Sequence, residues 1–326
     1  MTSVHDRLVV PADDQWHERP DHPHWNESGW FGFSAPERGL TGALYMYHRP
    51  NMNYTQAGVW VWDDSGENTW DCLYHDWWDT TALSPDAQVF DYTSENGLSV
   101  KSVDLGRDYN LGYDGWGFQM DLRFRAYMDA HPSNWVGGAE EWAPHHYEQG
   151  GRVTGHIVVD GEEIPIDCLT CRDHSWGIRR YVSNPRGDFP WAIASEDAGF
   201  VVTAISELPR DTDPIVGTTE SLVGGWYMRD GVIADIVRGS GTRRVVQRGA
   251  DGRPEVVLVS AVDELGRTLE AEGRMYNHLV YPLYPHYYMW WSGASWSFDG
   301  LTGYGDEMDY YPGDQARRWL RSLKRT

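Results

Sequence analysis

The chain has 326 residues, 40% of them hydrophobic, which is enough to bury one large all-β core or two cores of ordinary size. Its net charge of −22 argues against binding to nucleic acids or anionic membranes, because phosphate contacts require a basic patch. No stretch approaches the roughly 18 consecutive apolar residues of a membrane helix, and the N-terminus lacks the apolar run of a signal peptide. We therefore expect a cytoplasmic protein without membrane insertion.

Short segments rich in aromatic and β-branched residues predict strands along the whole chain. In the first half these segments are 30–34, 40–47, 57–62, 70–78, 88–92, 98–103 and 116–127. In the second half they are 153–159, 162–166, 225–228, 232–237, 256–262, 268–275, 287–298 and 301–310. Asp160-Gly161 and Asp230-Gly231 each predict a two-residue hairpin turn. Residues 314–323 predict a C-terminal helix, because Pro312-Gly313 precedes them and Arg and Lys follow; a weaker helical pattern covers 138–148.

Closely spaced strands without alternating helices predict an all-β protein built from sandwiches or barrels. The segment 130–151 is rich in Pro and Gly and resembles a linker. We therefore expect two β domains in tandem, comprising residues 1–135 and 136–326. The oligomeric state stays open, with a homodimer as one alternative.

The most informative segment is Cys171-Arg172-Asp173-His174-Ser175-Trp176-Gly177, which lies in a predicted strand. Because side chains alternate along a strand, His174 and Trp176 share one face, and Asp173 and Ser175 share the other. A carboxyl group, an imidazole and an indole so close together indicate acid–base chemistry beside an aromatic wall. The alternative is a structural polar ladder in which Trp176 fills core.

Aromatic residues are unusually frequent, with 18 Trp and 19 Tyr against 8 Phe. Trp and Tyr suit the wall of a ligand cavity, because each combines an apolar body with a polar tip. Packing between sheets is the alternative for any single pair. The residues that we predict to bind substrate are Tyr45, Tyr47, Trp60, His75, Trp226, Tyr288, Trp290, Trp296 and Glu307.

Fingerprints of common cofactor enzymes are missing from the sequence, including dinucleotide-binding, phosphate-binding and nucleophile-elbow motifs. Lysine occurs only twice, which leaves little room for Schiff-base chemistry. Cys168 and Cys171 have no second pair to complete a zinc site, and three cysteines do not form a disulfide framework. We therefore expect no cofactor and no metal. A metal enzyme that uses His145, His146, Glu148 or His156 remains a rival hypothesis.

The segment Asp173-His174-Ser175-Trp176-Gly177 resembles the D-H-x-W-G signature of a two-domain lipocalin-like superfamily. That group includes carotenoid hydratase and, more distantly, tocopherol cyclase and decalin-forming pericyclases. Residues 26–33, 42–47 and 303–307 also resemble its opening and closing strands, in an uncharacterised bacterial branch. The resemblance implies two tandem calycin-type barrels, a ligand cavity without cofactor, and a pocket lined by Asp173, His174 and Trp176. Ser175 stands where the hydratases usually have Asn, which separates this chain from the carotenoid branch.

The leading hypothesis is a cofactor-independent lyase or isomerase: a hydratase, dehydratase or cyclase. It would act on a small, hydrophobic, isoprenoid- or polyketide-like molecule, with Asp173 or His174 delivering the proton and Trp176 steadying positive charge. The main rival is a lipocalin-like protein that binds an apolar ligand without catalysis.

Overall fold

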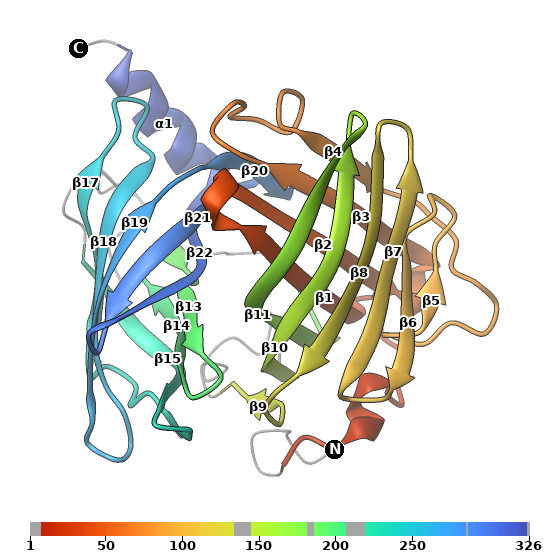
Figure 1. The fold of residues 1–326 in the computed structure, drawn as a ribbon, viewed down its shortest axis with the longest axis horizontal. Helices are drawn as coiled ribbons and strands as arrows, with labels where there is room; N and C mark the ends of the chain where they lie inside the picture. The colour runs from red at the N-terminus through yellow and green to blue at the C-terminus, as the bar shows by residue number, and fades with distance from the viewer. Residues whose placement is uncertain (1–7, 134–144, 181–185, 207–218, 285, 325–326) are drawn as a thin grey trace. The chain divides into compact units, whose positions relative to one another are not determined.

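The computed structural model describes residues 8–133, 145–180, 186–206, 219–284 and 286–324 (Figure 1). The chain forms two compact units. Unit 1 contains residues 1–62 and 73–181, and unit 2 contains residues 63–72 and 182–326. The fold is all-β, with a closed eight-stranded barrel, a half-barrel sheet and one short C-terminal helix, as the sequence predicts. Among the described residues, none of the helices has the length and apolar character needed to cross a membrane.

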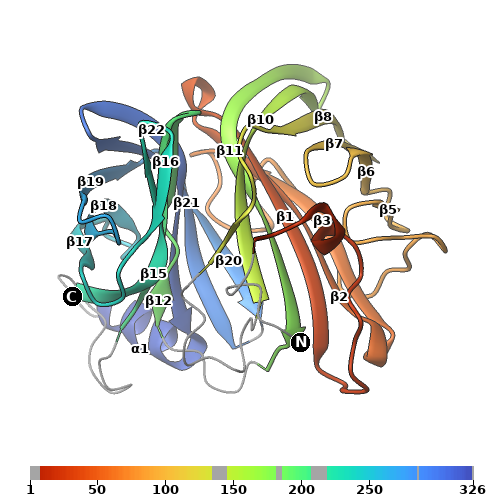
Figure 2. The ribbon, with the colours of Figure 1, turned by 90° about the horizontal axis from the view of Figure 1, so that it is seen from below.

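Unit 1 is built on an open, antiparallel sheet. Its strands are β1 (Trp25–Ala35), β2 (Leu40–Arg49), β3 (Tyr54–Trp62), β4 (Tyr74–Trp78), β5 (Tyr92–Thr93), β6 (Ser99–Asp104), β7 (Asp108–Gly115), β8 (Phe118–Ala126), β9 (His131–Pro132), β10 (His145–Val159) and β11 (Glu162–Ile178). The described residues of this unit also form the 3₁₀ helices η2 (Pro11–Asp14), η3 (Pro36–Arg38) and η4 (Pro50–Met52). The strand order is β4-β3-β2-β1-β11-β10-β8-β7-β6-β5, so β11 lies in the middle of the sheet, and Figure 2 shows it between β1 and β10.

Unit 2 is the closed barrel. Its strands are β12 (Gly187–Asp188), β13 (Trp191–Ser195), β14 (Ala198–Ile205), β15 (Thr219–Arg229), β16 (Val232–Asp235), β17 (Thr242–Arg248), β18 (Pro254–Val262), β19 (Thr268–Met275), β20 (Leu279–Tyr284), β21 (Tyr287–Phe298) and β22 (Leu301–Pro312). The order β14-β13-β22-β21-β19-β18-β17-β15 returns to its start, because β14 also pairs with β15. Helix α1 (Gly313–Leu323) follows β22 and confirms the predicted C-terminal helix.

The two predicted hairpin turns are confirmed. Asp160 and Gly161 have φ values of 51° and 89° between β10 and β11, and Asp230 and Gly231 have 53° and 73° between β15 and β16. Two successive residues with positive φ match the type I′ turn, whose twist suits a hairpin.

The units divide near residue 181 instead of residue 135, so the D-H-S-W-G segment belongs to unit 1. Residues 145–148, for which a weak helix is expected, begin the long strand β10, and the preceding residues of that pattern lie outside the described part of the chain. Gly150 and Gly151 do not mark a linker. A Cβ atom at Gly151 would lie 2.2 Å from the ring of Phe124, so the glycine makes room for an aromatic side chain against the strand.

One face of the unit 1 sheet carries the hydrophobic core, which includes Phe31, Leu44, Val59 and Val153. Residues paired directly across antiparallel strands share a face, so the register extends this face to Arg172, His174 and Trp176 in β11. The opposite face carries Asp173 and Ser175.

Candidate functional site

Strand β11 lies between β1 and β10. His174 is opposite Gly29 on one side and Tyr147 on the other. The ring centroids of His174 and Trp176 are 4.8 Å apart, in agreement with the expectation that they share a face.

The His174 face is closed. The His174 side chain is 0% exposed, and its ring contacts the edges or faces of Phe90, Tyr147 and Trp176. Trp176 is also buried and stacks on His17, with centroids 4.0 Å apart. The structure therefore places His174 and Trp176 among packed side chains of unit 1.

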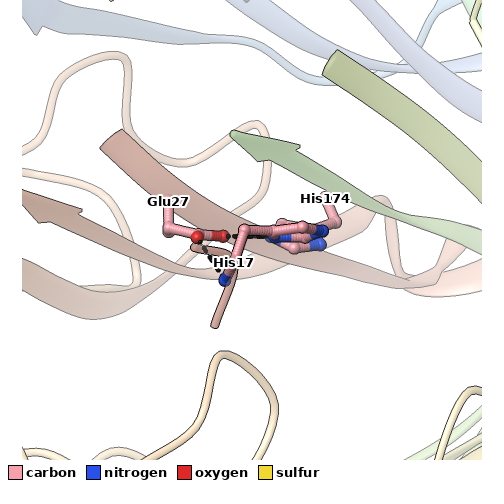
Figure 3. A group of neighbouring side chains, drawn as sticks. All are labelled: His17, Glu27 and His174. Carbon is pink, nitrogen blue, oxygen red and sulfur yellow. Dashed lines mark hydrogen bonds and ion pairs between the residues drawn. The ribbon is translucent and has the colours of Figure 1, made fainter. Parts of the chain in front are cut away.

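A carboxylate joins two imidazoles on this face (Figure 3). Glu27 Oε2 lies 3.2 Å from Nδ1 of His17 and 3.1 Å from Nε2 of His174, and the backbone N–H of His17 donates to Glu27 Oε1 at 2.8 Å. Burial lowers the pKa of His17, but the nearby carboxylates of Asp13 and Glu27 outweigh this effect and raise it to about 9. Burial dominates at His174 and lowers its pKa, although Glu27 partly opposes the shift. Two imidazoles and a carboxylate are also a metal-ligand set. In this structure the Glu27 carboxylate is satisfied by its hydrogen bonds with His17 and His174.

The same face buries a charged pair that the sequence analysis missed. Arg172 contacts Asp14 through Nη1 at 3.1 Å and Nη2 at 2.8 Å, and both side chains are almost fully buried. The hydroxyls of Tyr109 and Tyr147 also donate to Asp14. The guanidinium carbon of Arg172 lies 4.7 Å from the ring centroid of Phe90, one of several rings that enclose it. The pair anchors η2 to the centre of the sheet.

The opposite face carries a row of side chains that crosses the sheet. Successive pairings place Glu148 beside Asp173, Asp173 beside Trp30, and Trp30 beside Tyr45. Tyr45 in turn pairs with Gly58 of β3, and Gly58 pairs with Trp77 of β4. The rings of Tyr45 and Trp77 stack with centroids 5.8 Å apart. The row therefore begins with two acids and continues as aromatic surface. A Cβ atom at Gly58 would lie 1.9 Å from the backbone oxygen of Asp76, so the glycine permits the close approach of β4.

Asp173 is the acid of this row on which the functional interpretation rests. Burial raises its pKa to about 6, with a further contribution from Glu148, whereas His146 and Arg179 oppose the shift. Its Oδ1 atom is shielded from solvent and has no hydrogen-bond partner among the described residues. A buried carboxyl oxygen without a partner is costly, which marks Asp173 as a candidate functional residue.

A hydrogen-bonded chain lies beside Asp173 on the same face. Nδ1 of His146 is 2.5 Å from Ser175 Oγ, and Nε2 is 2.9 Å from Glu148 Oε1. Ser133 donates to the other carboxylate oxygen of Glu148. Burial lowers the pKa of His146, but Glu148 outweighs it and raises the pKa overall. The chain links two neighbours of Asp173 and can hold or move a proton.

The predicted binding residues of the first half lie on this face as well. Tyr45 and Tyr47 have ring centroids 6.5 Å apart, and Trp60 lies 5.6 Å from Trp77. His75 pairs with Trp60 across β3 and β4, and burial lowers its pKa. The sheet thus brings these four residues onto the side of Asp173, away from His174.

The predicted binding residues of the second half belong to unit 2 and lie in several places. Trp296 packs against Phe200 in the barrel core. Trp290 packs against Tyr311 and Trp319, beneath helix α1.

Trp226 lies on the outward side of the barrel, because it pairs with Val201, and the residues next to Val201 in β14 point inward. Tyr288 is exposed. Glu307 is buried beside Arg243, and burial raises its pKa to about 7. These residues do not form one site within unit 2.

His145, His146, Glu148 and His156, the metal ligands of the rival hypothesis, do not gather into one group. His145 and His146 are adjacent in β10 and point to opposite faces, and His146 is occupied by Ser175 and Glu148. Within the described ranges, the groups whose atoms are close enough for one ion are His17–Glu27–His174 and Glu67–Asp251–His278. His146 and Glu148 are two residues apart, so a strand over this segment would have predicted that they share a face. The interpretation of residues 130–151 as a linker prevented that prediction.

Similar structures support the fold. An AttH-like protein from Nitrosomonas europaea superposes with a TM-score of 0.62 at 15% identity, covering 94% of this chain and 96% of that chain. Kievitone hydratase from Nectria haematococca superposes with a TM-score of 0.58 at 13% identity, covering 94% of each chain. The protein CghA gives a TM-score of 0.59 at 12% identity, covering 89% of each chain. These matches show that the chain shares its fold with all three proteins.

No curated protein matches the chain. A family of proteins does match it, over residues 10–308, which include most of both units. The chain therefore belongs to the family described as a domain of unknown function, DUF7064.

Proposed function

We propose that the protein is a cofactor-independent lyase or isomerase that transfers a proton through Asp173. The reaction class is the addition or removal of water, or a cyclisation, on a small hydrophobic molecule of isoprenoid or polyketide type. The observation that carries the proposal is the Asp173 carboxyl group, which combines a pKa of about 6 with an unpartnered oxygen in a row of aromatic side chains.

A carboxyl group with a pKa near 6 is partly protonated close to neutral pH, so it can donate a proton and later accept one. Glu148 favours the protonated form by repulsion, and the His146 chain offers a second proton carrier beside it. The rings of Tyr45 and Trp77 are suited to stabilise a developing cation, at about 0.5–2 kcal/mol for each ring.

In this proposal His174 and Trp176 are positioning residues. They pack behind β11, on the face opposite Asp173, and Glu27 fixes the imidazole. We therefore propose Asp173, and not His174, as the proton donor. The similarity to kievitone hydratase supports the class of reaction at the level of fold. We further propose a cytoplasmic location, no nucleic-acid partner and no membrane insertion, with a homodimer as one alternative.

The test is proton transfer in deuterated water. The purified protein is incubated in D₂O with a panel of isoprenoid and polyketide compounds that carry an alkene, an enone or a tertiary alcohol. Deuterium on a carbon atom of recovered substrate or product, dependent on wild-type protein, is the expected result.

Asp173→Asn should lose this incorporation and retain ligand binding, measured by quenching of tryptophan fluorescence. Asp167→Asn is the matched control, because Asp167 lies in the same strand with its side chain exposed. Equal incorporation by Asp173→Asn and wild type would refute the proposal. Tight binding of a compound without exchange in any variant would favour a non-catalytic carrier, for which the buried aromatic side chains alone suffice.

A further inference from the structure

Three side chains meet in unit 2, outside the segments discussed above. Glu67 lies in segment 63–72, which belongs to this unit. The backbone oxygen of Glu67 accepts a 2.7 Å hydrogen bond from the N–H of Val280. His278 directly precedes β20, and Asp251 lies in the turn between β17 and β18. Backbone pairing of Asn68 with Val280 fixes the approach of the first segment to the second.

The imidazole of His278 points between the two acids. Its Nε2 atom lies 3.8 Å from Glu67 Oε1 and 3.8 Å from Asp251 Oδ2. The side chain is only 10% exposed, and Nε2 has no hydrogen-bond partner in the part of the chain that the structure describes. A buried polar atom without a partner is costly, and both separations exceed an ordinary hydrogen bond.

The spacing suits an ion between the three groups. Bonds from Zn²⁺ to imidazole nitrogen and to carboxylate oxygen are about 2.0–2.2 Å, so two such bonds can span 3.8 Å. The three ligand atoms lie within 4.8 Å of one another.

The surroundings favour a cation and leave it accessible. Glu67 and His278 line a cavity of about 490 Å³ together with Asp64, Glu255 and Asn277. Arg253 donates to Asp251 at 3.0 Å and holds that carboxylate in place, while Arg274 of the same cavity is paired with Glu272 at 2.6 Å. Carboxylates thus outnumber free positive charges around His278, and the cavity leaves room for water on an ion.

We propose that Glu67, Asp251 and His278 form a binding site for a divalent transition-metal ion such as Zn²⁺, with its remaining coordination positions open to the cavity. One nitrogen and two oxygen ligands are typical of such ions, and an open position is typical of sites that bind a further ligand. The site lies within unit 2, so it is independent of the proton-transfer row of unit 1.

The experiment is calorimetric titration of the full-length protein, dialysed against EDTA and then into metal-free buffer, with ZnCl₂. The expected result is one equivalent bound, with affinity at least tenfold weaker in both Glu67→Gln and His278→Gln. Glu67 is 58% exposed, so its substitution should leave the fold intact, as far-UV circular dichroism would verify.

Two controls make the outcome specific. His286→Gln removes an exposed histidine of the same unit and should bind Zn²⁺ like wild type. His17→Gln removes one ligand of the buried His17–Glu27–His174 group and should also leave the affinity unchanged. The proposal would be overturned if the wild-type protein bound no stoichiometric Zn²⁺, or if Glu67→Gln and His278→Gln bound it as tightly as wild type. Loss of binding in His17→Gln instead would also overturn it.

Discussion

Asp173 and Tyr45 share a cross-strand row, because each is paired directly with Trp30, from opposite sides of β1. With strands about 4.8 Å apart, the acid and the phenol are therefore roughly two strand spacings from one another. This relationship joins a carboxyl group to an aromatic surface on one face, while His174 lies on the other face of the same strand.

Asp173→Asn should reduce turnover by about 10²–10⁴-fold, because an amide cannot donate the proton that the reaction needs. Stability should not fall, since the substitution removes a carboxylate whose charge burial disfavours. Initial rates and urea unfolding, both compared with Asp167→Asn, check the two parts. A normal rate would exclude Asp173 as the acid.

The rate of the protonating direction should fall as pH rises. The pKa of Asp173 is raised to about 6, so the protonated donor predominates below that pH and is lost above it, by tenfold for each further pH unit. A profile of kcat/KM between pH 5 and 8 measures the effect. A profile that is flat across this range would contradict the assignment.

His17 should stabilise the protein in a pH-dependent manner. Its folded pKa of about 9 exceeds the ordinary value of 6.5, so its contribution is fully present below pH 6.5 and disappears as pH rises through 9. We expect His17→Gln to lower the free energy of unfolding by roughly 1–3 kcal/mol at pH 6 and by much less at pH 10. Urea unfolding at pH 6 and pH 10 measures this difference. A loss of unfolding free energy of equal size at the two pH values would refute the linkage.

Asp14→Asn should destabilise unit 1 strongly. The change leaves the buried guanidinium of Arg172 without its carboxylate, at a cost of about 3–5 kcal/mol. The matched control is Asp91→Asn, which breaks the exposed pair with Lys101 and should cost at most about 1 kcal/mol. The midpoints of urea unfolding separate the two outcomes, and similar losses in both variants would show that the buried pair has no special weight.

The barrel of unit 2 should depend on Arg243. This buried residue contacts Asp188 at 2.9 Å, Glu220 at 3.2 Å and also Glu307. Arg243→Met would leave these acids without their shared cation and should cost at least about 3 kcal/mol.

Arg244 supplies the control for the barrel, because it follows in the same strand β17 with an exposed side chain. Arg244→Met should change the free energy of unfolding by no more than about 0.5 kcal/mol. Thermal or urea unfolding of both variants checks the difference, and an Arg243→Met protein as stable as Arg244→Met would contradict the prediction.

Much of the fold could be predicted from local patterns. The aromatic and β-branched segments, the Asp-Gly turns and the basic end of residues 314–323 predicted an all-β chain with a C-terminal helix. The domain boundary could not be predicted in this way. Gly150 and Gly151 resemble a linker by composition, yet they lie inside β10. They are glycines because the side chains of Tyr127 and Phe124 occupy the space that a Cβ atom would take.

The sequence by itself determined that Asp173 and His174 point in opposite directions, since side chains alternate along any strand. Only the tertiary structure decided which direction leads into the closed core, because that depends on the partners of β11. Arg172 and His174 point to the face filled by Phe31, Tyr147 and η2, whereas Asp173 points to the face of Glu148 and Tyr45. Those partners are far from residue 173 in the chain, and long-range pairing is a property that no local pattern encodes.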